Sequence, residues 1–295
     1  MQSPLPGASG GRGALVPWLL AAPVILLYMA CLVLPLAVLL VTSFTTFDPR
    51  GGGPTEFTVA NYAKALGDSF YLGVLFRTMW LACLVTLVTL VVGYPVAYYV
   101  RLSSGRAQAY LLLLIIAPLM VSLIVRAFGW VVVFGSRGVL NFLLLRAGLI
   151  ETPLRLMYTE LAVIIGMAHV YFPFMVLALL SSLQNIDPTL RLAANNLGAG
   201  RVRTFWRITL PLSLPGVLAG SMIVFCLSAS AFVTPTVLGG PRVKVMAYMV
   251  WEQFLLILNW PLGAAIGFVL LVITTGLMLV YNRLLERGRF GIVFQ

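Results

Sequence analysis

The chain has 295 residues, of which 61% are hydrophobic and only 9% are charged, with a formal net charge of +11. Soluble domains carry about 25% charged residues, so this composition argues against a soluble enzyme, a secreted disulfide scaffold and a disordered chain. In a membrane protein a basic surplus reports orientation more often than nucleic-acid binding.

Six stretches are long and apolar enough to cross a membrane, since a spanning helix needs about 20 predominantly apolar residues. We predict an all-α membrane protein whose spans cover residues 14–41, 71–100, 108–134, 161–183, 212–237 and 261–284. The first stretch is too long for the apolar core of a signal peptide. The chain then divides into an N-terminal tail (1–13), a transmembrane domain (14–285) and a C-terminal tail (286–295).

Six spans place both termini on one side of the membrane, and the charges indicate which side. The termini, the turn between spans two and three, and the connection between spans four and five together hold ten arginines and two acids. The opposite side holds eight basic and six acidic residues. Because basic residues concentrate on the cytoplasmic side, we expect both termini, and both tails, in the cytoplasm.

The sequence offers little for a metal or a nucleotide. Cys31, Cys83 and Cys226 lie in apolar runs with no C-x-x-C pair, so we expect small buried side chains and not metal ligands. One histidine is too few for a histidine-based metal site, and we expect no metal. The chain also lacks the G-x-x-x-x-G-K-[ST] run that cradles ATP phosphates.

Proline recurs within the predicted spans, at positions 23, 35, 95, 118, 173 and 235. Each proline removes a helical hydrogen bond and kinks its helix. Such kinks suit a moving, solute-lined bundle, although proline is also simply better tolerated in membrane helices.

Arg126 is the one formal charge well inside a predicted span. Such a charge usually faces the bundle interior or a cavity and marks a functional site. Alternatively, its guanidinium snorkels, or pairs with a carbonyl or with an acid such as Glu160. Trp130 lies one turn further along on the same face, where its indole could hold an ammonium group or anchor the helix at the membrane interface.

Five more polar residues in spans four and five are candidates for a solute path. His169 is either a gating or proton-linked group, or a histidine hydrogen-bonded across helices, and Tyr171 lies close by in the sequence. Span five carries Ser228, Ser230 and Thr234 among small residues. These three either line a polar path or allow helices to pack closely.

The connection between spans four and five, residues 185–216, has the clearest local pattern. Asp187 followed by Pro188 is a helix-start signal, and Gly198 is a helix stop that allows a left-handed turn. We therefore predict a short helix, a glycine turn and a second short helical piece. Pro211 and Pro215 are expected to break the chain before span five.

The first of these helices has an apolar face, which is unexpected on a helix surrounded only by water. Its members at helical spacing are Leu190, Ala193, Ala194 and Leu197. Arginines flank the segment, and Phe205 and Trp206 could anchor a partner groove. The pattern predicts a docking element for a cytoplasmic protein. The alternative is an amphipathic helix on the membrane, with its arginines at anionic headgroups.

This stretch resembles the cytoplasmic signature of ABC-importer permeases, in which E-A-A is followed by a glycine, an aromatic residue and a leucine-proline pair. The matching residues are Ala193, Ala194, Gly198, Ala199, Phe205, Ile208, Leu210, Pro211, Pro215 and Gly216. The resemblance extends from about Pro17 to Leu285. Residues 125–130, 166–174 and 260–265 are most similar to the spermidine/putrescine subfamily.

By this resemblance, residues of the connection couple the permease to an ATPase. They are Leu190, Leu192, Ala193, Ala194, Leu197, Gly198, Ala199, Phe205 and Trp206. Leu192 stands where the signature has glutamate. In the family this helix sits in a groove of the ATPase subunit, so the change removes a charge-assisted contact worth about 1.5–3 kcal/mol where it is made. Docking by shape and apolar contact survives that loss.

The resemblance implies a type I, MetI-like permease in the bacterial inner membrane, forming half of the translocation path of an ATP-driven importer. Its implied partners are a second, similar permease, two ATPase subunits, an extracytoplasmic solute-binding protein and membrane lipid, but no nucleic acid. The chain itself would be non-catalytic and bind no cofactor, since ATP and Mg belong to the ATPase subunits. In the family span five borders the path, which favours a lining role for Ser228, Ser230 and Thr234.

The solute implied by the resemblance is a polyamine of the spermidine/putrescine class. No acid lies deep in any span to compensate its charges, and Arg126 argues against a polycation. Recognition by an external binding protein would remove this conflict. Another solute, such as an amino-acid derivative, stays open, as does a self-sufficient secondary transporter or channel for which the 187–210 segment is incidental. A membrane-embedded enzyme is disfavoured, because clustered carboxylates and histidines are missing.

Overall fold

The computed structural model describes residues 15–48 and 56–287, and the regular elements within those ranges are all helical. An isolated antiparallel bridge joins Thr45 to Phe57. The helices long and apolar enough to cross a membrane are Ala21–Ser43, Ser69–Leu102, Leu123–Arg146, Glu160–Gln184, Arg201–Ala229 and Trp260–Arg283. The prediction of an all-α protein with six spans is therefore confirmed. The N-terminal tail and residues 288–295 lie outside the described residues.

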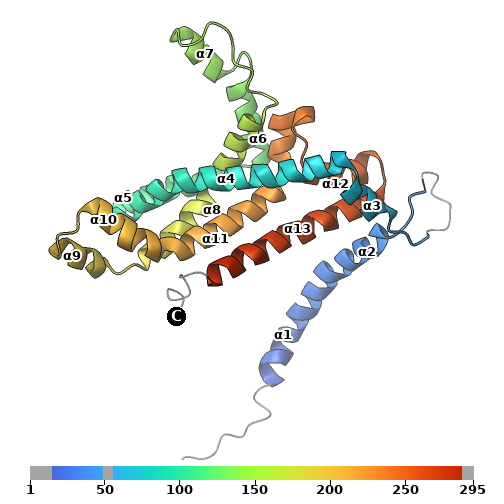
Figure 1. The fold of residues 1–295 in the computed structure, drawn as a ribbon, viewed down its shortest axis with the longest axis horizontal. Coiled ribbons are helices and arrows are strands. Elements are labelled where there is room, and N and C mark those ends of the chain that lie inside the picture. The colour runs from blue at the N-terminus through green and yellow to red at the C-terminus, as the bar shows by residue number, and fades with distance from the viewer. Residues whose placement is uncertain (1–14, 49–55, 288–295) are drawn as a thin grey trace, which may run out of the picture.

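Three helices form the centre of the bundle: α4 (Ser69–Leu102), α8 (Glu160–Gln184) and α11 (Leu210–Ala229). They lie side by side in Figure 1. Their apolar side chains share one buried cluster, which includes Leu81, Val85, Met175, Leu179 and Val224. Gly216 marks a close approach of α11 to α8, because a Cβ there would lie only 2.8 Å from the carbonyl oxygen of Ala178.

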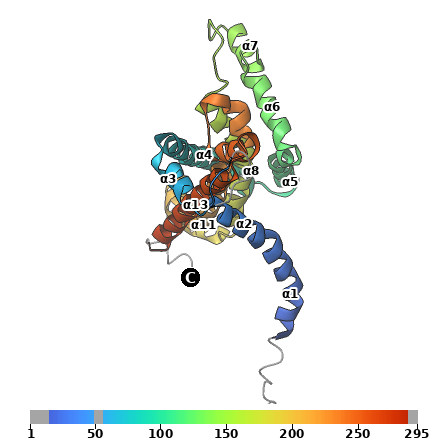
Figure 2. The same ribbon diagram turned by 90° about the vertical axis from the view of Figure 1, so that its right-hand side faces the viewer.

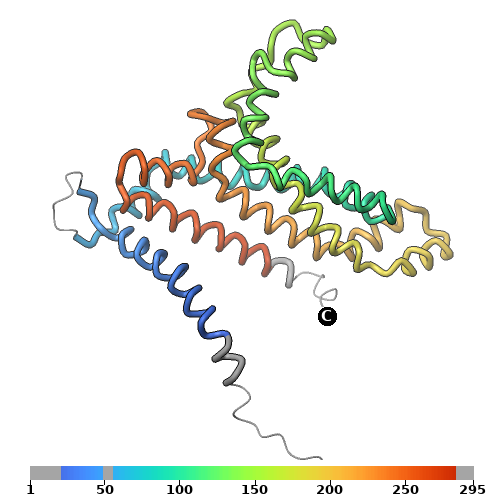
Figure 3. The backbone as a smooth tube through the Cα atoms, turned by 180° about the vertical axis from the view of Figure 1, so that it is seen from behind, coloured from blue at the N-terminus to red at the C-terminus, as the bar shows by residue number. Residues whose placement is uncertain are grey.

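The last span, α13 (Trp260–Arg287), connects the first span to this centre. It packs against α2 (Leu34–Ser43), α3 (Ala60–Gly67) and α12 (Met246–Trp251), and Figure 3 shows it running between α2 and the rest of the bundle. A second buried cluster forms there from Tyr71, Val74, Met246, Met249, Leu262 and Ile266. The first and last spans of the chain are therefore neighbours.

The N-terminal part of the first span diverges from the bundle. α1 (Leu15–Tyr28) and the π turn η1 (Met29–Val33) lead into α2, and Figure 2 shows α1 extending away from the other helices. The most apolar 18-residue window of this span contains no buried residue. The described chain leaves the apolar surface of α1 and η1 exposed, so lipid or another subunit covers that surface in the membrane.

The third predicted span is not a single helix, which corrects the expectation for residues 108–134. It is divided into α5 (Gly105–Ile116), the 3₁₀ turn η2 (Ala117–Met120) and α6 (Leu123–Phe134). The chain changes direction after η2, so that α6 and α7 (Val139–Arg146) project from the bundle in Figure 1. Pro118 lies in η2 and accounts for the break, because proline cannot donate the next helical hydrogen bond.

The prolines at the start of span five do not break the chain, contrary to the prediction. Pro211 and Pro215 lie in a continuous helical run made of α10 (Arg201–Thr204), the π turn η3 (Phe205–Thr209) and α11. The wider π turn accommodates the hydrogen bond that Pro211 cannot make. Span five ends early, at Ala229; residues 230–232 interrupt the helix, and a short helical piece follows that contains the π turn η4 (Pro235–Gly239).

The three cysteines are exposed and not buried, which corrects another expectation. Cys31 lies in η1, Cys83 in α4 and Cys226 in α11. A thiol behaves as a small apolar group, so it can face hydrocarbon without being packed inside its own chain. Among the described residues, no three His, Cys, Asp or Glu side chains gather in a group that could hold a metal ion.

Candidate functional site

The segment between α8 and α11 has the local structure that its sequence predicts. Asp187 caps α9 (Pro188–Asn196) by accepting a hydrogen bond from the backbone N–H of Thr189 at 2.8 Å, which lowers the pKa of Asp187. Gly198 follows the helix with a φ of +77°, a left-handed conformation that glycine adopts without strain. The chain then turns into α10 at one end of the bundle (Figure 1).

Arg101, to which the sequence analysis gave no site role, fixes where this segment begins. From the end of α4 it donates from Nε to the carbonyl of Leu183 at 2.9 Å and from Nη2 to that of Ile186 at 3.2 Å. Carbonyls at a helix end lack helical partners, so this fork secures the end of α8. Arg191 of α9 also lies over the ring of Tyr98 of α4, at 5.8 Å. A basic residue in the last turn of a long span is the signal that could have identified Arg101.

The predicted coupling residues divide between an outer and an inner face. The exposed members are Leu190, Leu192, Ala193, Leu197, Gly198 and Trp206. Leu197 is 88% exposed, although it is a large apolar side chain. Ala194 is buried and Ala199 is half-buried. The outer face is therefore an apolar surface at the end of the bundle that the described chain leaves uncovered.

Phe205 faces the bundle. Its ring lies edge-on to those of Tyr94 and Tyr98, with centroids 5.6 and 5.8 Å away. The hydroxyl of Tyr94 in turn hydrogen-bonds to that of Ser213 at 2.7 Å. Trp206 touches Phe205 edge-on but remains exposed. Of this aromatic pair, Trp206 is the residue that presents an exposed ring.

Three of the predicted solute-path residues, Arg126, Trp130 and His169, come together where α6 meets α8. The indole Nε1 of Trp130 donates a hydrogen bond to Nδ1 of His169 at 3.3 Å, and the two rings lie edge-on at 5.6 Å. Arg126 interacts electrostatically with both His169 and Tyr171. His169 is thus hydrogen-bonded across helices. The two helices bring a cation, an indole and an imidazole into one polar site within the spans, and Tyr171 lies two residues beyond His169 on α8.

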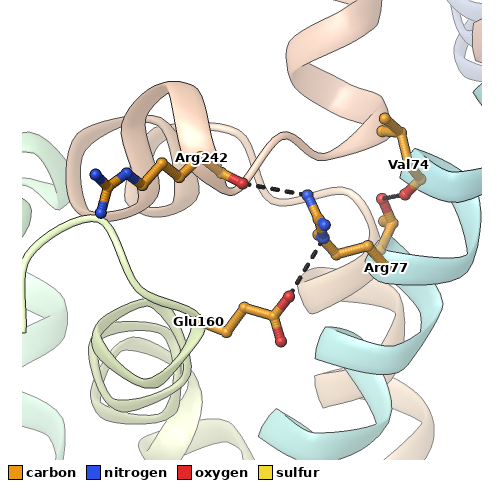
Figure 4. A network of polar contacts seen from close by, with 5 residues as sticks. Val74, Arg77, Glu160 and Arg242 are labelled. Atoms are coloured by element: carbon orange, nitrogen blue, oxygen red, sulfur yellow. Dashed lines mark hydrogen bonds and ion pairs between the residues drawn. The ribbon is translucent and has the colours of Figure 1, made fainter. Parts of the chain in front are cut away.

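Arg126 is the unusual member of this site. Its Nε and Nη1 atoms are buried and have no hydrogen-bond partner among the described residues. Glu160, the acid considered as its partner from the sequence, instead pairs with Arg77 at 3.2 Å, and Arg77 also donates to the carbonyl of Arg242 at 3.2 Å (Figure 4). A desolvated, unpaired charge is costly, so an acceptor from outside the described chain would stabilise Arg126.

The span-five candidates do not share one surface. Thr234 is buried, and its Cγ2 atom lies 3.0 Å from where a Cβ on Gly166 would be, so it packs against α8. Ser228 is buried, and its hydroxyl has no partner within the described ranges. Ser230 is exposed and donates to the carbonyl of Cys226 in its own helix at 3.0 Å. Ser230 is therefore the hydroxyl of this group that faces outward.

A further group, which sequence reasoning missed, lies toward the end of the bundle opposite α9. Phe232, Tyr248 and Trp251 form an aromatic cluster with ring centroids 5.5–6.5 Å apart. Beside it, Nζ of Lys244 lies 3.6 Å from Oε1 of Glu252. Tyr248 and Trp251 are three residues apart on one helix, a spacing that places both rings on one face and is the signal that was overlooked.

The apolar spans, the polar site within them and the exposed segment at one end together define a membrane-spanning transport subunit. The chain belongs to the family of binding-protein-dependent transport system inner membrane components, whose model matches residues 89–289. It is accordingly a multi-pass inner-membrane component of a transport system, and the expected membership of the ABC-importer permeases is confirmed.

Curated relatives agree with this family, and solved structures share the fold. The chain is 36% identical over 250 residues to the spermidine/putrescine transport system permease protein PotB of Escherichia coli (strain K12). The aligned region covers 85% of this chain and 90% of that protein. The chain is 33% identical over 257 residues to PotB of Haemophilus influenzae, covering 86% and 90%. Its fold matches a crystal structure of a bacterial ABC transporter involved in the import of the acidic polysaccharide alginate. That match has a TM-score of 0.79 at 19% sequence identity, over 94% of this chain and 98% of that one.

Proposed function

We propose that this chain is one of two permease subunits of an ATP-driven importer for a polyamine of the spermidine/putrescine class. The observation that carries the proposal is the 36% identity to a spermidine/putrescine permease over 85% of the chain. Both termini lie in the cytoplasm. The chain is non-catalytic and binds no cofactor, and ATP with Mg is bound by separate ATPase subunits.

A second, similar permease, two ATPase subunits and an extracytoplasmic solute-binding protein complete the importer. A solved alginate ABC transporter of similar fold, with a TM-score of 0.78, is in complex with an alginate-bound periplasmic protein, which supports the binding-protein partner. The uncovered apolar surface of the first span supports contact with a second permease and with lipid.

ATP drives the transport through α9. The exposed apolar face of α9 docks on the ATPase, and closure of the ATPase pair on binding ATP moves that helix. Arg101 and Arg191 attach the segment to α4 and α8, so the motion reaches the central spans and opens the path alternately to each side. The polar site around Arg126 lies between helices that this motion displaces.

The docking step is tested by placing a charge on the exposed face. Leu197→Glu should reduce recovery of the ATPase with tagged chain from gently solubilised membranes and should abolish uptake, because Leu197 is 88% exposed and its replacement leaves the fold intact. Phe57→Glu is the matched control, since Phe57 is exposed as well but lies outside the spans and away from α9. Equal recovery of the ATPase with both variants would refute the docking role.

The importer itself is tested in proteoliposomes that contain both permeases and the ATPases, with binding protein outside. We expect uptake of labelled putrescine or spermidine that requires ATP and the binding protein. Uptake by this chain alone, without ATP, would replace the proposal with a self-sufficient transporter.

The unpartnered guanidinium of Arg126 favours a second candidate, a carboxylate-bearing solute such as an amino-acid derivative. A carboxylate would supply the two acceptors that Nε and Nη1 lack. Ornithine, which has two amines and one carboxylate, serves as the probe. Under this alternative, ornithine competes with putrescine uptake and Arg126→Gln abolishes the competition. A failure of ornithine to compete rejects it.

A further inference from the structure

A lysine ammonium occupies an aromatic and acidic corner toward the end of the bundle opposite α9. Nζ of Lys244 lies 3.6 Å from the Glu252 carboxylate. The same atom lies over the rings of Tyr248 and Phe70, at 5.6 and 5.8 Å from their centroids. Both distances are within the range at which ring faces attract cations. The corner therefore supplies what an ammonium group needs, one carboxylate and two ring faces.

The aromatic surface continues beyond the atoms that Lys244 contacts. The ring of Phe232 is nearly parallel to that of Tyr248, at 6.5 Å, and the indole of Trp251 lies 5.5 and 5.6 Å from the two rings. All three rings are half-buried, so each keeps some surface open to a ligand. This surface suits the methylene chain between the charges of an organic amine, because it removes apolar area from water.

A second carboxylate lies at the same corner. Asp68 accepts a hydrogen bond from the backbone N–H of Phe70, the residue whose ring faces Nζ of Lys244, so Asp68 lies on the same side of the bundle as Glu252. Asp68 is the N-terminal cap of α4, and Glu252 begins η6 (Glu252–Leu256), outside the spans on either side. Two acids around one aromatic surface match a molecule with two ammonium groups.

Lys244 is held loosely enough to be displaced. The side chains of Lys244 and Glu252 are 30% and 21% exposed, and partly exposed lysine pairs contribute little because water screens them and the side chain loses rotamer freedom. Arg77 and Glu160 form a useful contrast: their atoms lie 3.2 Å apart, and Arg77 is also anchored to a backbone carbonyl (Figure 4).

We propose that the corner formed by Glu252, Tyr248 and Phe70, with Trp251 beside Tyr248, is a binding site for the primary ammonium group of an organic amine, and that Lys244 is its built-in competitor. In the empty transporter the lysine ammonium occupies the site. An arriving amine displaces it and takes over the carboxylate and ring contacts. The site deepens the proposed function and rests on it only for the identity of the transported amine.

The proposal predicts opposite effects for the two partners of one ion pair. Butylamine binding would be measured by titration calorimetry on the assembled importer in nanodiscs, without binding protein. Lys244→Met should tighten binding about three- to tenfold, because the competitor is gone. Glu252→Gln should weaken it by a similar factor, because the carboxylate is gone. Glu160→Gln, which breaks the matched pair without rings, should leave affinity within about twofold.

A purely structural ion pair gives a different result, because breaking it from either side has the same consequence. If Lys244→Met and Glu252→Gln shift butylamine affinity in the same direction, or if neither shifts it, the proposal is overturned. Phe70→Leu retains the ion pair and removes one of the two rings that face the ammonium group, and it should weaken butylamine binding several-fold even if Glu252→Gln fails to assemble.

The two proposals fail in distinguishable ways. An importer that accumulates neither putrescine nor spermidine in the presence of ATP and binding protein refutes the polyamine function, yet the butylamine titration still tests the corner. An importer that does accumulate them, but whose Lys244→Met and Glu252→Gln variants bind butylamine alike, refutes the ammonium site alone.

Discussion

The contact of α11 with α8 at Gly216 yields a sharp prediction. A Cβ added there would lie 2.8 Å from the carbonyl oxygen of Ala178 and 3.2 Å from Cα of Leu179, and it would also contact Ser182. Because the obstructing atoms include backbone, the helices must separate, and overpacking of this kind costs about 1–3 kcal/mol. Replacing a helical glycine by alanine otherwise gains about 0.5–1 kcal/mol. The free energy of unfolding of the Gly216→Ala variant should therefore be lower than that of the parent chain by up to about 2.5 kcal/mol.

Gly276→Ala is the matched control for this prediction. Gly276 lies inside α13, and a Cβ there would meet no atom within 4 Å, so the variant should be neutral or slightly stabilised. Unfolding of both variants in mixed micelles with increasing dodecyl sulfate, followed by circular dichroism, measures the difference. We expect Gly216→Ala to be less stable than Gly276→Ala by about 1–3 kcal/mol. Equal stabilities would show that α8 and α11 can separate at Gly216 without loss of stability, and would refute the reasoning.

Three other substitutions test individual polar contacts. Arg101→Ala removes both hydrogen bonds at the end of α8 and should lower the free energy of unfolding by about 1.5–3 kcal/mol. It should also lower solute-stimulated ATPase activity of the assembled importer more than Arg101→Lys does. Asn141→Ala removes the three hydrogen bonds that this buried amide makes to the carbonyls of Gly135 and Leu154 and to the N–H of Leu154, so amide exchange around α7 should accelerate; unchanged exchange would contradict this. Thr78→Val leaves the buried N–H of Met246 unpaired and should lower the free energy of unfolding by about 1–3 kcal/mol. Thr78→Ser retains the hydrogen bond and should melt at the same temperature as the parent chain.

Local signals predicted local structure well, and neighbouring helices decided the rest. Asp187 and Gly198 start and end α9 as expected, because capping and a left-handed turn depend on a few adjacent residues. Pro118 and Pro211 had opposite outcomes: the first ends a helix, while the second follows a π turn inside a continuous run. Whether a helix can insert such a turn depends on its packing, which the sequence around a proline does not state.

The candidate site shows the same division. A charge within an apolar run identified Arg126, and the structure places it with Trp130 and His169. Glu160, the acid named as one alternative partner of Arg126, instead pairs with Arg77 on α4. That pairing joins residues 83 positions apart and depends on how two spans are rotated about their axes. Hydrophobic periodicity carries no such information when a helix is apolar all round.

The packing of α2 against α13 has a consequence for how the protein is made. Spans enter the membrane in chain order during synthesis. The first span therefore has no partner for its main contact within the chain until α13, the last span, has been synthesised. Contacts between residues so distant in sequence form slowly. We therefore expect the N-terminal helix to stay in contact with lipid while the centre of the bundle assembles, and the final span, which lies between these two parts in Figure 3, to dock last.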